Sequence, residues 1–203
     1  MPARTPHHSQ QGFTLIEVLV ALLVLSFGML GLIGMQAFAL KSNREAKFYS
    51  EGTNLAQELA EMMRGNNLVA IQTEALNNPY LSNTLNTGTV TSTCLAVGNA
   101  CATTKEVASA QMIEWRTRVR NALPGARLEI CFDSEPYSDA GLPQWACTPS
   151  AAGGNEVIVL KLGWSLRSTN SGATDEDAII GANDISSRPQ IILPVTGGNP
   201  FPL

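Results

Sequence analysis

Residues 12–23 read Gly12-Phe13-Thr14-Leu15-Ile16-Glu17-Val18-Leu19-Val20-Ala21-Leu22-Leu23. They open an apolar run that reaches about Met35, and between Val18 and Met35 only Ser26 has a side chain that is not apolar. A helix needs roughly 20 such residues to cross a hydrocarbon core of ~30 Å. The run therefore predicts a transmembrane helix over about residues 13–35.

Glu17 is the exception within this stretch. An ionised carboxylate inside a membrane costs on the order of 3 kcal/mol on insertion scales, so Glu17 is a candidate functional residue that needs a cation at the same depth. A secretory signal has its small-residue cleavage site after the apolar run, whereas Gly12 lies before it. Cleavage between Gly12 and Phe13 would keep the apolar helix on the mature chain. It would also create an α-amino group on Phe13, about one helical turn from Glu17.

Residues 12–17 match, at every position, the motif G-F-T-L-[IV]-E, and the chain thereby resembles type IV prepilins and pseudopilins with a class III leader. The resemblance implies that residues 1–12 are a leader peptide. It implies that a prepilin peptidase cleaves after Gly12 and that Phe13 is N-methylated. It also implies an assembly role for Glu17, which would receive the amine of a neighbouring subunit.

Within this family the chain most resembles minor pilins of the PilV type, the pilus modification proteins, in the long start Gly12–Leu22 and in two further runs, Gly28–Leu32 and Trp115–Gly125. This resemblance implies a role in initiating, assembling or modifying type IV pili, in support of twitching motility and adhesion. The implied partners are the prepilin peptidase, other minor pilins, the major pilin, the inner-membrane assembly platform and the lipid bilayer. The implied location is the bacterial inner membrane, with one pass and a periplasmic C-terminal domain, and then the pilus or cell surface.

Two alternatives to a minor pilin remain open. A minor pseudopilin of a type II secretion system would share the leader, the helix and the fold. A periplasmic enzyme or receptor would instead keep an uncleaved signal anchor. The formal net charge of −4 gives no reason to expect nucleic acid as a partner.

Four cysteines lie after the apolar run, none of them in a C-x-x-C pair: Cys94, Cys101, Cys131 and Cys147. This spacing matches neither a zinc site nor a thioredoxin-like motif, and an oxidising compartment explains the even number best. Three disulfide pairings are possible. Pairing Cys94 with Cys101 and Cys131 with Cys147 is favoured because each bond closes a short loop, although the sequence alone does not decide.

One pattern opposes a periplasmic C-terminal domain. Lys41, Arg44 and Lys47 follow the apolar run closely, and the positive-inside rule taken alone would place them in the cytoplasm. The cysteines and the leader motif outweigh this count.

The rest of the chain predicts an α+β, pilin-like fold. Phe48, Leu55, Leu59 and Met62 form an apolar stripe, so the helix is expected to cover residues 13–65, with a membrane half and an amphipathic half. The globular domain is expected over residues 66–203. It should contain a second helix that starts at the capping box Thr103-x-x-Glu106 and ends at Pro124-Gly125. Alternating apolar residues predict half-buried antiparallel strands over residues 128–133 and 158–167, and a last strand over residues 190–195.

No catalytic motif appears in the sequence. It has no nucleophile elbow, zinc-protease motif, phosphate-binding loop or dinucleotide fingerprint. Both histidines, His7 and His8, belong to the expected leader, so the mature chain would have none for acid–base work. We therefore expect no enzyme, no cofactor and no metal site.

Overall fold

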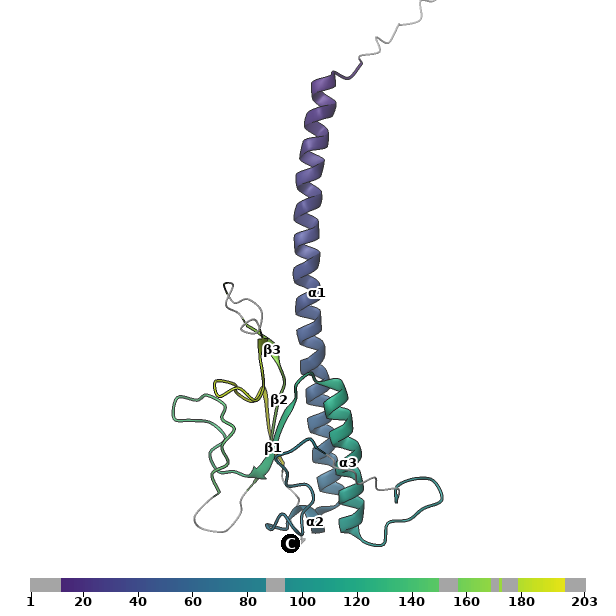
Figure 1. The fold of residues 1–203 in the computed structure, drawn as a ribbon, viewed down its shortest axis with the longest axis vertical. Coiled ribbons are helices and arrows are strands. Elements are labelled where there is room, and N and C mark those ends of the chain that lie inside the picture. Colours follow the sequence, from purple (N-terminus) through teal and green to yellow (C-terminus); the bar gives the residue numbers. More distant parts are fainter. Residues whose placement is uncertain (1–11, 87–93, 150–156, 169–171, 173–178, 196–203) are drawn as a thin grey trace, which may run out of the picture. The chain divides into compact units, whose positions relative to one another are not determined.

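The structure of the chain is a computed structural model that describes residues 12–86, 94–149, 157–168, 172 and 179–195 (Figure 1). Residues 1–11 of the expected leader thus lie outside the described residues. The chain divides into two compact units, residues 1–46 and residues 47–203. Helix α1, Leu15–Gly65, contributes residues to both units.

In the first unit, the described residues form the start of α1. The carbonyl of Thr14 accepts hydrogen bonds from the N–H groups of Glu17 and Val18, and these bonds begin the helix. Every described side chain from Gly12 to Ala46 is exposed. The apolar residues of this segment therefore remain uncovered by the other described residues of the unit.

In the second unit, α1 buries one stripe of small and aliphatic residues. The buried positions follow spacings of three and four residues: Gly52, Leu55, Ala56, Leu59, Ala60 and Met63. The predicted stripe contained Phe48 and Met62 in place of Met63, but both are only partly buried against the core. Met63 continues the four-residue step from Leu55 and Leu59, which explains its full burial.

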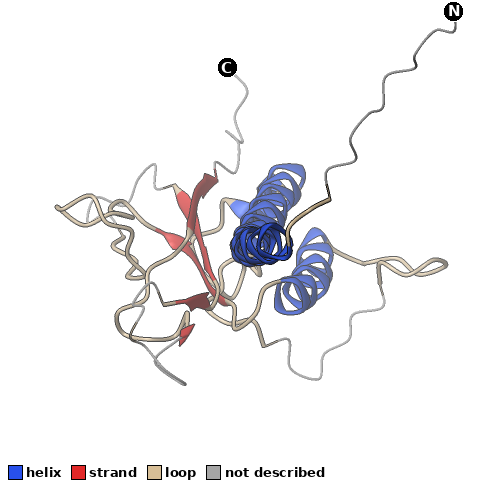
Figure 2. Cartoon of the chain, turned by 90° about the horizontal axis from the view of Figure 1, so that it is seen from above, coloured by secondary structure: helices blue, strands red, loops and turns tan. Residues whose placement is uncertain are grey.

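The second unit places helices against one face of a small antiparallel sheet (Figure 2). The three-stranded sheet has the order β1-β2-β5, with β1 at Arg127–Phe132, β2 at Ile158–Gly163 and β5 at Ile191–Val195. Both pairs of neighbouring strands are antiparallel. Two short strands, β3 (Leu166–Arg167) and β4 (Ile179–Ile180), pair separately. With the long apolar helix, this is the predicted α+β, pilin-like arrangement.

Helix α3, Thr104–Ala122, supplies the other helical wall of the core, and the short helix α2 covers Asn67–Ala70. The hydroxyl of Thr103 accepts from the N–H of Glu106, as the capping box predicts, while the Glu106 carboxylate accepts from the N–H of Ala102. Trp115 is fully buried, and its indole N–H donates to the carbonyl of Leu55 at 2.9 Å. This bond joins α3 to the part of α1 that lies in the second unit.

Strand β2 differs from its prediction in burial and in length. It was expected to be half-buried, yet all six of its residues are buried. Its second face is covered by the loop of residues 134–148, a contact that a period-two pattern does not reveal. The strand also ends at Gly163, because Trp164 and Ser165 direct their N–H groups to Gln190 and Pro124.

Gly52 allows α1 to lie close to the sheet in the second unit. A Cβ atom at this position would come within 2.8 Å of Ile191 Cδ1 and 2.9 Å of Trp164 Cζ3. Trp164 is fully buried and meets Tyr49 edge-on, with ring centroids 5.1 Å apart. Gly52 thus has a packing function that its low helix propensity does not suggest.

Candidate functional site

The predicted cleavage and assembly residues lie at the start of the described chain. Gly12 and Phe13 precede α1, whose first turn contains Glu17. Phe13 is 83% exposed, and a Cβ atom at Gly12 would meet nothing within 4 Å. The peptide bond between Gly12 and Phe13 is therefore sterically open to an enzyme. Because the helix begins only at Leu15, the backbone between Phe13 and Glu17 is helical over part of its length.

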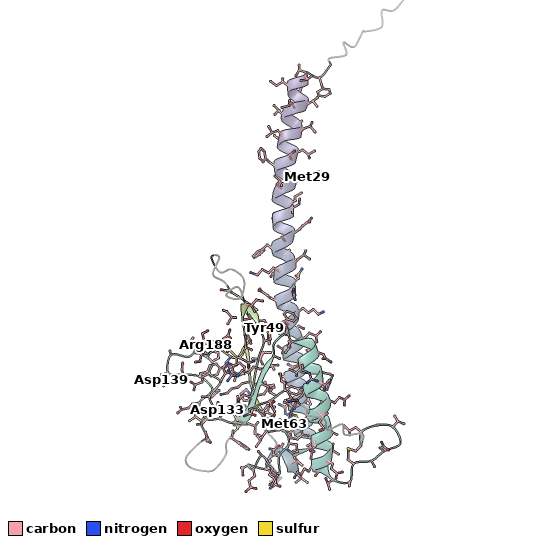
Figure 3. The ribbon with its side chains drawn as sticks, viewed as in Figure 1. Met29, Tyr49, Met63, Asp133, Asp139 and Arg188 are labelled. Carbon is pink, nitrogen blue, oxygen red and sulfur yellow. A yellow bond between two sulfur atoms is a disulfide. The ribbon has the colours of Figure 1, made fainter. Side chains whose placement is uncertain are left out.

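The part of α1 that lies in the first unit exposes apolar side chains on its surface. Large side chains such as Leu19, Met29 and Phe38 are more than half exposed, and Met29 points away from the helix (Figure 3). Within the described residues, α1 is the helix long and apolar enough to cross a membrane. A helix that is apolar on all sides is stable when lipid or other helices cover it. Glu17 places one carboxylate in this surface.

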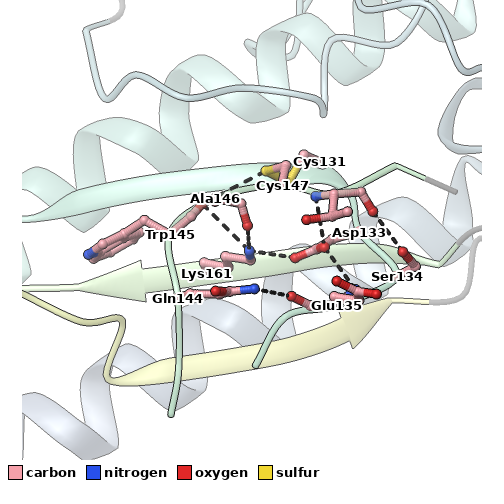
Figure 4. Close-up of a disulfide and its surroundings, with 10 residues drawn as sticks. Cys131, Asp133, Ser134, Glu135, Gln144, Trp145, Ala146, Cys147 and Lys161 are labelled. Atoms are coloured by element: carbon pink, nitrogen blue, oxygen red, sulfur yellow. Dashed lines mark hydrogen bonds and ion pairs between the residues drawn. A yellow bond between two sulfur atoms is a disulfide. The ribbon is translucent and has the colours of Figure 1, made fainter. Parts of the chain in front are cut away.

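A second cluster of ionisable groups lies inside the second unit. Lys161 of β2 and Asp133, just after β1, are both fully buried, and Lys161 Nζ lies 2.5 Å from Asp133 Oδ2 (Figure 4). The ammonium also donates to the carbonyl of Ala146. Asp133 Oδ1 accepts from the N–H groups of Glu135 and Thr148, each at 3.0 Å. The pair is thus almost completely hydrogen-bonded without water.

For Asp133 and Glu129, burial raises the pKa of the carboxyl group, whereas interactions with neighbouring groups lower it. Burial raises the pKa of Asp133, but the hydrogen bonds from Lys161, Thr148 and Glu135 together lower it by a larger amount. The net pKa of Asp133 therefore lies below its ordinary value. Glu129 is opposite Lys161 in the β1–β2 register. Burial raises the pKa of Glu129, and the charges of Arg127 and Lys161 offset part of this rise.

Two disulfides belong to the second unit, Cys94–Cys101 and Cys131–Cys147. They are the local pairings that the cysteine spacing favoured. Glu129 lies near Cys131 and Cys147, with one potential ligand atom of each residue within 4.8 Å of the others. Because the two sulfur atoms are bonded to each other, they offer no thiolate to a metal ion.

Sequence reasoning missed the pair of Lys161 and Asp133, although a signal for it was present. Glu129, Cys131 and Asp133 alternate with the apolar residues of β1, and Lys161 does the same in β2. Once the two strands are paired, these positions share one face. The alternating pattern gives no sign of the loop of residues 134–148. This loop covers the face that alternation predicts to be solvated, and so buries it.

Residues 7–33 match the family model described as the prokaryotic N-terminal methylation motif. The match includes Gly12, Phe13 and Glu17, and it supports a type IV pilin-like or pseudopilin protein. Such a motif implies processing by a prepilin peptidase and assembly with other pilins, and with the apolar helix it fits anchoring in a membrane. No curated protein and no solved structure matches the chain.

Proposed function

We propose that this chain is a minor type IV pilin of the PilV type, which takes part in initiating, assembling or modifying type IV pili. The observation that carries the assignment to type IV pilin-like proteins is the motif of residues 12–17, which lies within the matched methylation motif and leads into the exposed apolar helix. The runs Gly28–Leu32 and Trp115–Gly125 support the PilV type. In this role the chain supports twitching motility and adhesion as a structural subunit. Its pilin-like arrangement is typical of structural proteins rather than of enzymes.

Processing follows from the chemistry of the first residues. A prepilin peptidase cleaves the bond after Gly12, where the missing side chain permits close approach to the backbone. N-methylation of the new Phe13 amine leaves it able to carry a positive charge. Glu17 then needs a cation once the helix leaves water, and the amine of a neighbouring subunit supplies one.

The disulfides support a periplasmic orientation of the second unit. Both disulfides belong to the second unit, and such bonds persist in oxidising compartments such as the periplasm. We therefore place the second unit in the periplasm before assembly and on the pilus or cell surface afterwards. Its partners there are other minor pilins and the major pilin, and the assembly platform in the inner membrane.

Processing is tested by intact mass spectrometry of protein taken from membranes. The expected mature chain begins at Phe13 and carries one additional methyl group. The variant Gly12→Leu should accumulate as the full-length precursor, because a bulky side chain then occupies the position before the cleaved bond. Gly28→Leu is the matched control, since Gly28 is open and distant from that bond, and it should be processed normally. Normal processing of Gly12→Leu would contradict the proposal.

A deletion strain separates the pilus from a type II secretion system. Loss of pili and of twitching with normal secretion supports the minor pilin. The opposite result would assign the chain to a secretion pseudopilin. An intact N-terminus on the wild-type protein would indicate a signal-anchored enzyme or receptor instead.

A further inference from the structure

The Lys161 ammonium lies where a free cation would be unstable. Its side chain is fully buried, and moving an ion out of water is unfavourable unless close partners replace the water. Two groups do so directly, the carboxylate of Asp133 and the carbonyl of Ala146. The carbonyl of Trp145 lies 3.5 Å from the same nitrogen.

These partners come from two segments that one disulfide joins. Asp133 lies two residues after Cys131, and Ala146 immediately precedes Cys147. Thr148, on the other side of Cys147, donates its N–H to Asp133. The Cys131–Cys147 bond therefore ties the acid of the ion pair to the carbonyl that shares its ammonium (Figure 4).

Apart from the disulfide and the ion pair, noncovalent contacts hold the loop of residues 134–148, among them a hydrogen bond from Arg188 to the carbonyl of Pro143 at 3.0 Å. Trp145 stacks with the Arg127 guanidinium 4.3 Å from its ring centroid, and its indole N–H donates to Ser187 at 3.2 Å. Ser134 donates to the carbonyl of Thr148 through both its N–H and its hydroxyl group. Each of these contacts is individually weak, so the covalent Cys131–Cys147 bond is the strongest single constraint on the loop.

We propose that the Cys131–Cys147 disulfide is a redox-controlled clamp on the buried Lys161–Asp133 pair. In the oxidised chain it holds the loop over the sheet, so that Lys161 is inaccessible. Reduction by a dithiol breaks the S–S bond with two electrons and two protons, and yields two cysteine thiols and the oxidised dithiol. The loop then moves away and water reaches Lys161, while the helices and the strands stay folded. The inference does not depend on the proposed function.

Amine labelling of the full-length protein in detergent tests the clamp. An acetylating reagent is applied with and without a dithiol, and each lysine is quantified by peptide mapping. Acetylation of Lys161 should rise roughly tenfold or more on reduction, because labelling then follows the open state of the loop. Lys105, which is exposed in the oxidised chain, should be labelled equally in both conditions. Unchanged protection of Lys161 after both thiols are proven free would overturn the proposal.

Two pairs of substitutions distinguish this disulfide from the other. Cys131→Ser with Cys147→Ser should expose Lys161 without any dithiol, whereas Cys94→Ser with Cys101→Ser should leave it protected. Equal exposure in both variants would show that the effect is not specific to the clamp. If the first variant does not fold, the wild-type comparison with and without dithiol still decides the question.

Hydrogen exchange separates local release from general unfolding. On reduction, amides of residues 143–148 should lose protection, while those of α3 and β5 should keep theirs. Loss of protection in all three segments would mean that reduction unfolds the second unit, which contradicts a clamp.

Discussion

Asp133 links the stability of the second unit to acid pH. Its folded-state pKa lies below the ordinary value of 3.8, so its ionised form stabilises the fold. This contribution is fully present above pH 3.8, and it is lost as the pH falls from there through the lower folded-state pKa. Urea unfolding of the full chain should therefore give a falling free energy of unfolding across this window.

A double variant provides the comparison for this pH dependence. Asp133→Leu with Lys161→Met replaces the pair by apolar groups of similar size, a change that is often neutral or stabilising by about 1–4 kcal/mol. Below pH 3.8 its free energy of unfolding should fall less steeply than that of the wild type. Asp139→Asn, in an exposed part of the loop, should keep the wild-type slope. Identical slopes in the wild type and the double variant would show that the pair does not govern acid stability.

Gly52 should not tolerate even a methyl group. Alanine gains about 1 kcal/mol in helix propensity, but overpacking a dense core costs about 1–3 kcal/mol. The added Cβ meets the fully buried ring of Trp164, which has little room to move. We expect a net loss of about 1 kcal/mol for Gly52→Ala by thermal or urea unfolding. Gly65→Ala, where a Cβ meets nothing within 4 Å, should show no such loss, and equal stability of the two variants would contradict the packing argument.

At the scale of single elements, the start of α3 depends on the Thr103 hydroxyl. It satisfies the N–H of Glu106, one of the groups at a helix start that lack an intrahelical partner. Thr103→Ala should lower the free energy of unfolding by about 1 kcal/mol. Thr104→Ala removes a similar hydroxyl from an exposed helical position and should have little effect. A Thr103→Ala variant as stable as this control would mean that the cap is replaced by water at no cost.

Helices α1 and α3 and strands β1, β2 and β5 were predictable because their signals are local. The capping box marked the start of α3, and alternation marked β1 and β2. What the sequence could not show depends on contacts between distant segments. Strand β2 ends before Trp164 because the N–H groups of Trp164 and Ser165 bond to Gln190 and Pro124. Lys161 is buried because the loop that contains Cys147 covers it.

The candidate site divides in the same way. Gly12, Phe13 and Glu17 are recognisable in sequence because their order along the chain is itself the signal. The pairing of Lys161 with Asp133 becomes visible only after strand register is known. Cysteine spacing favoured the observed disulfides, but it held no information on the ion pair that one of them encloses.

At the scale of the whole molecule, the two units need different surroundings. The second unit has its own buried core, which begins in α1 at Leu55 and extends to Val195. The first unit exposes its apolar side chains and has no buried residue among those described. An environment outside the chain must therefore cover the first unit, and a membrane or a bundle of similar helices meets this need.

Glu17 distinguishes simple anchoring from assembly. Glu17→Ala removes a charge from an apolar helix, so the variant should remain in the membrane. It should also be cleaved after Gly12, because the scissile bond and its neighbours are unchanged. What it should lose is the carboxylate that pairs with the Phe13 amine of a neighbouring subunit. We therefore expect normal processing by intact mass, but strongly reduced incorporation into sheared pili and reduced twitching.

Glu45→Ala is the matched control for this variant, because Glu45 is an exposed acid of the same helix beyond the apolar run. It should keep wild-type incorporation if the effect belongs to the carboxylate within the apolar segment. Glu17→Asp tests distance as well as charge, since its shorter side chain carries the same carboxylate and should restore incorporation in part. Wild-type incorporation and motility with Glu17→Ala would remove the carboxylate from the assembly mechanism, because the helix would then act through its apolar surface alone.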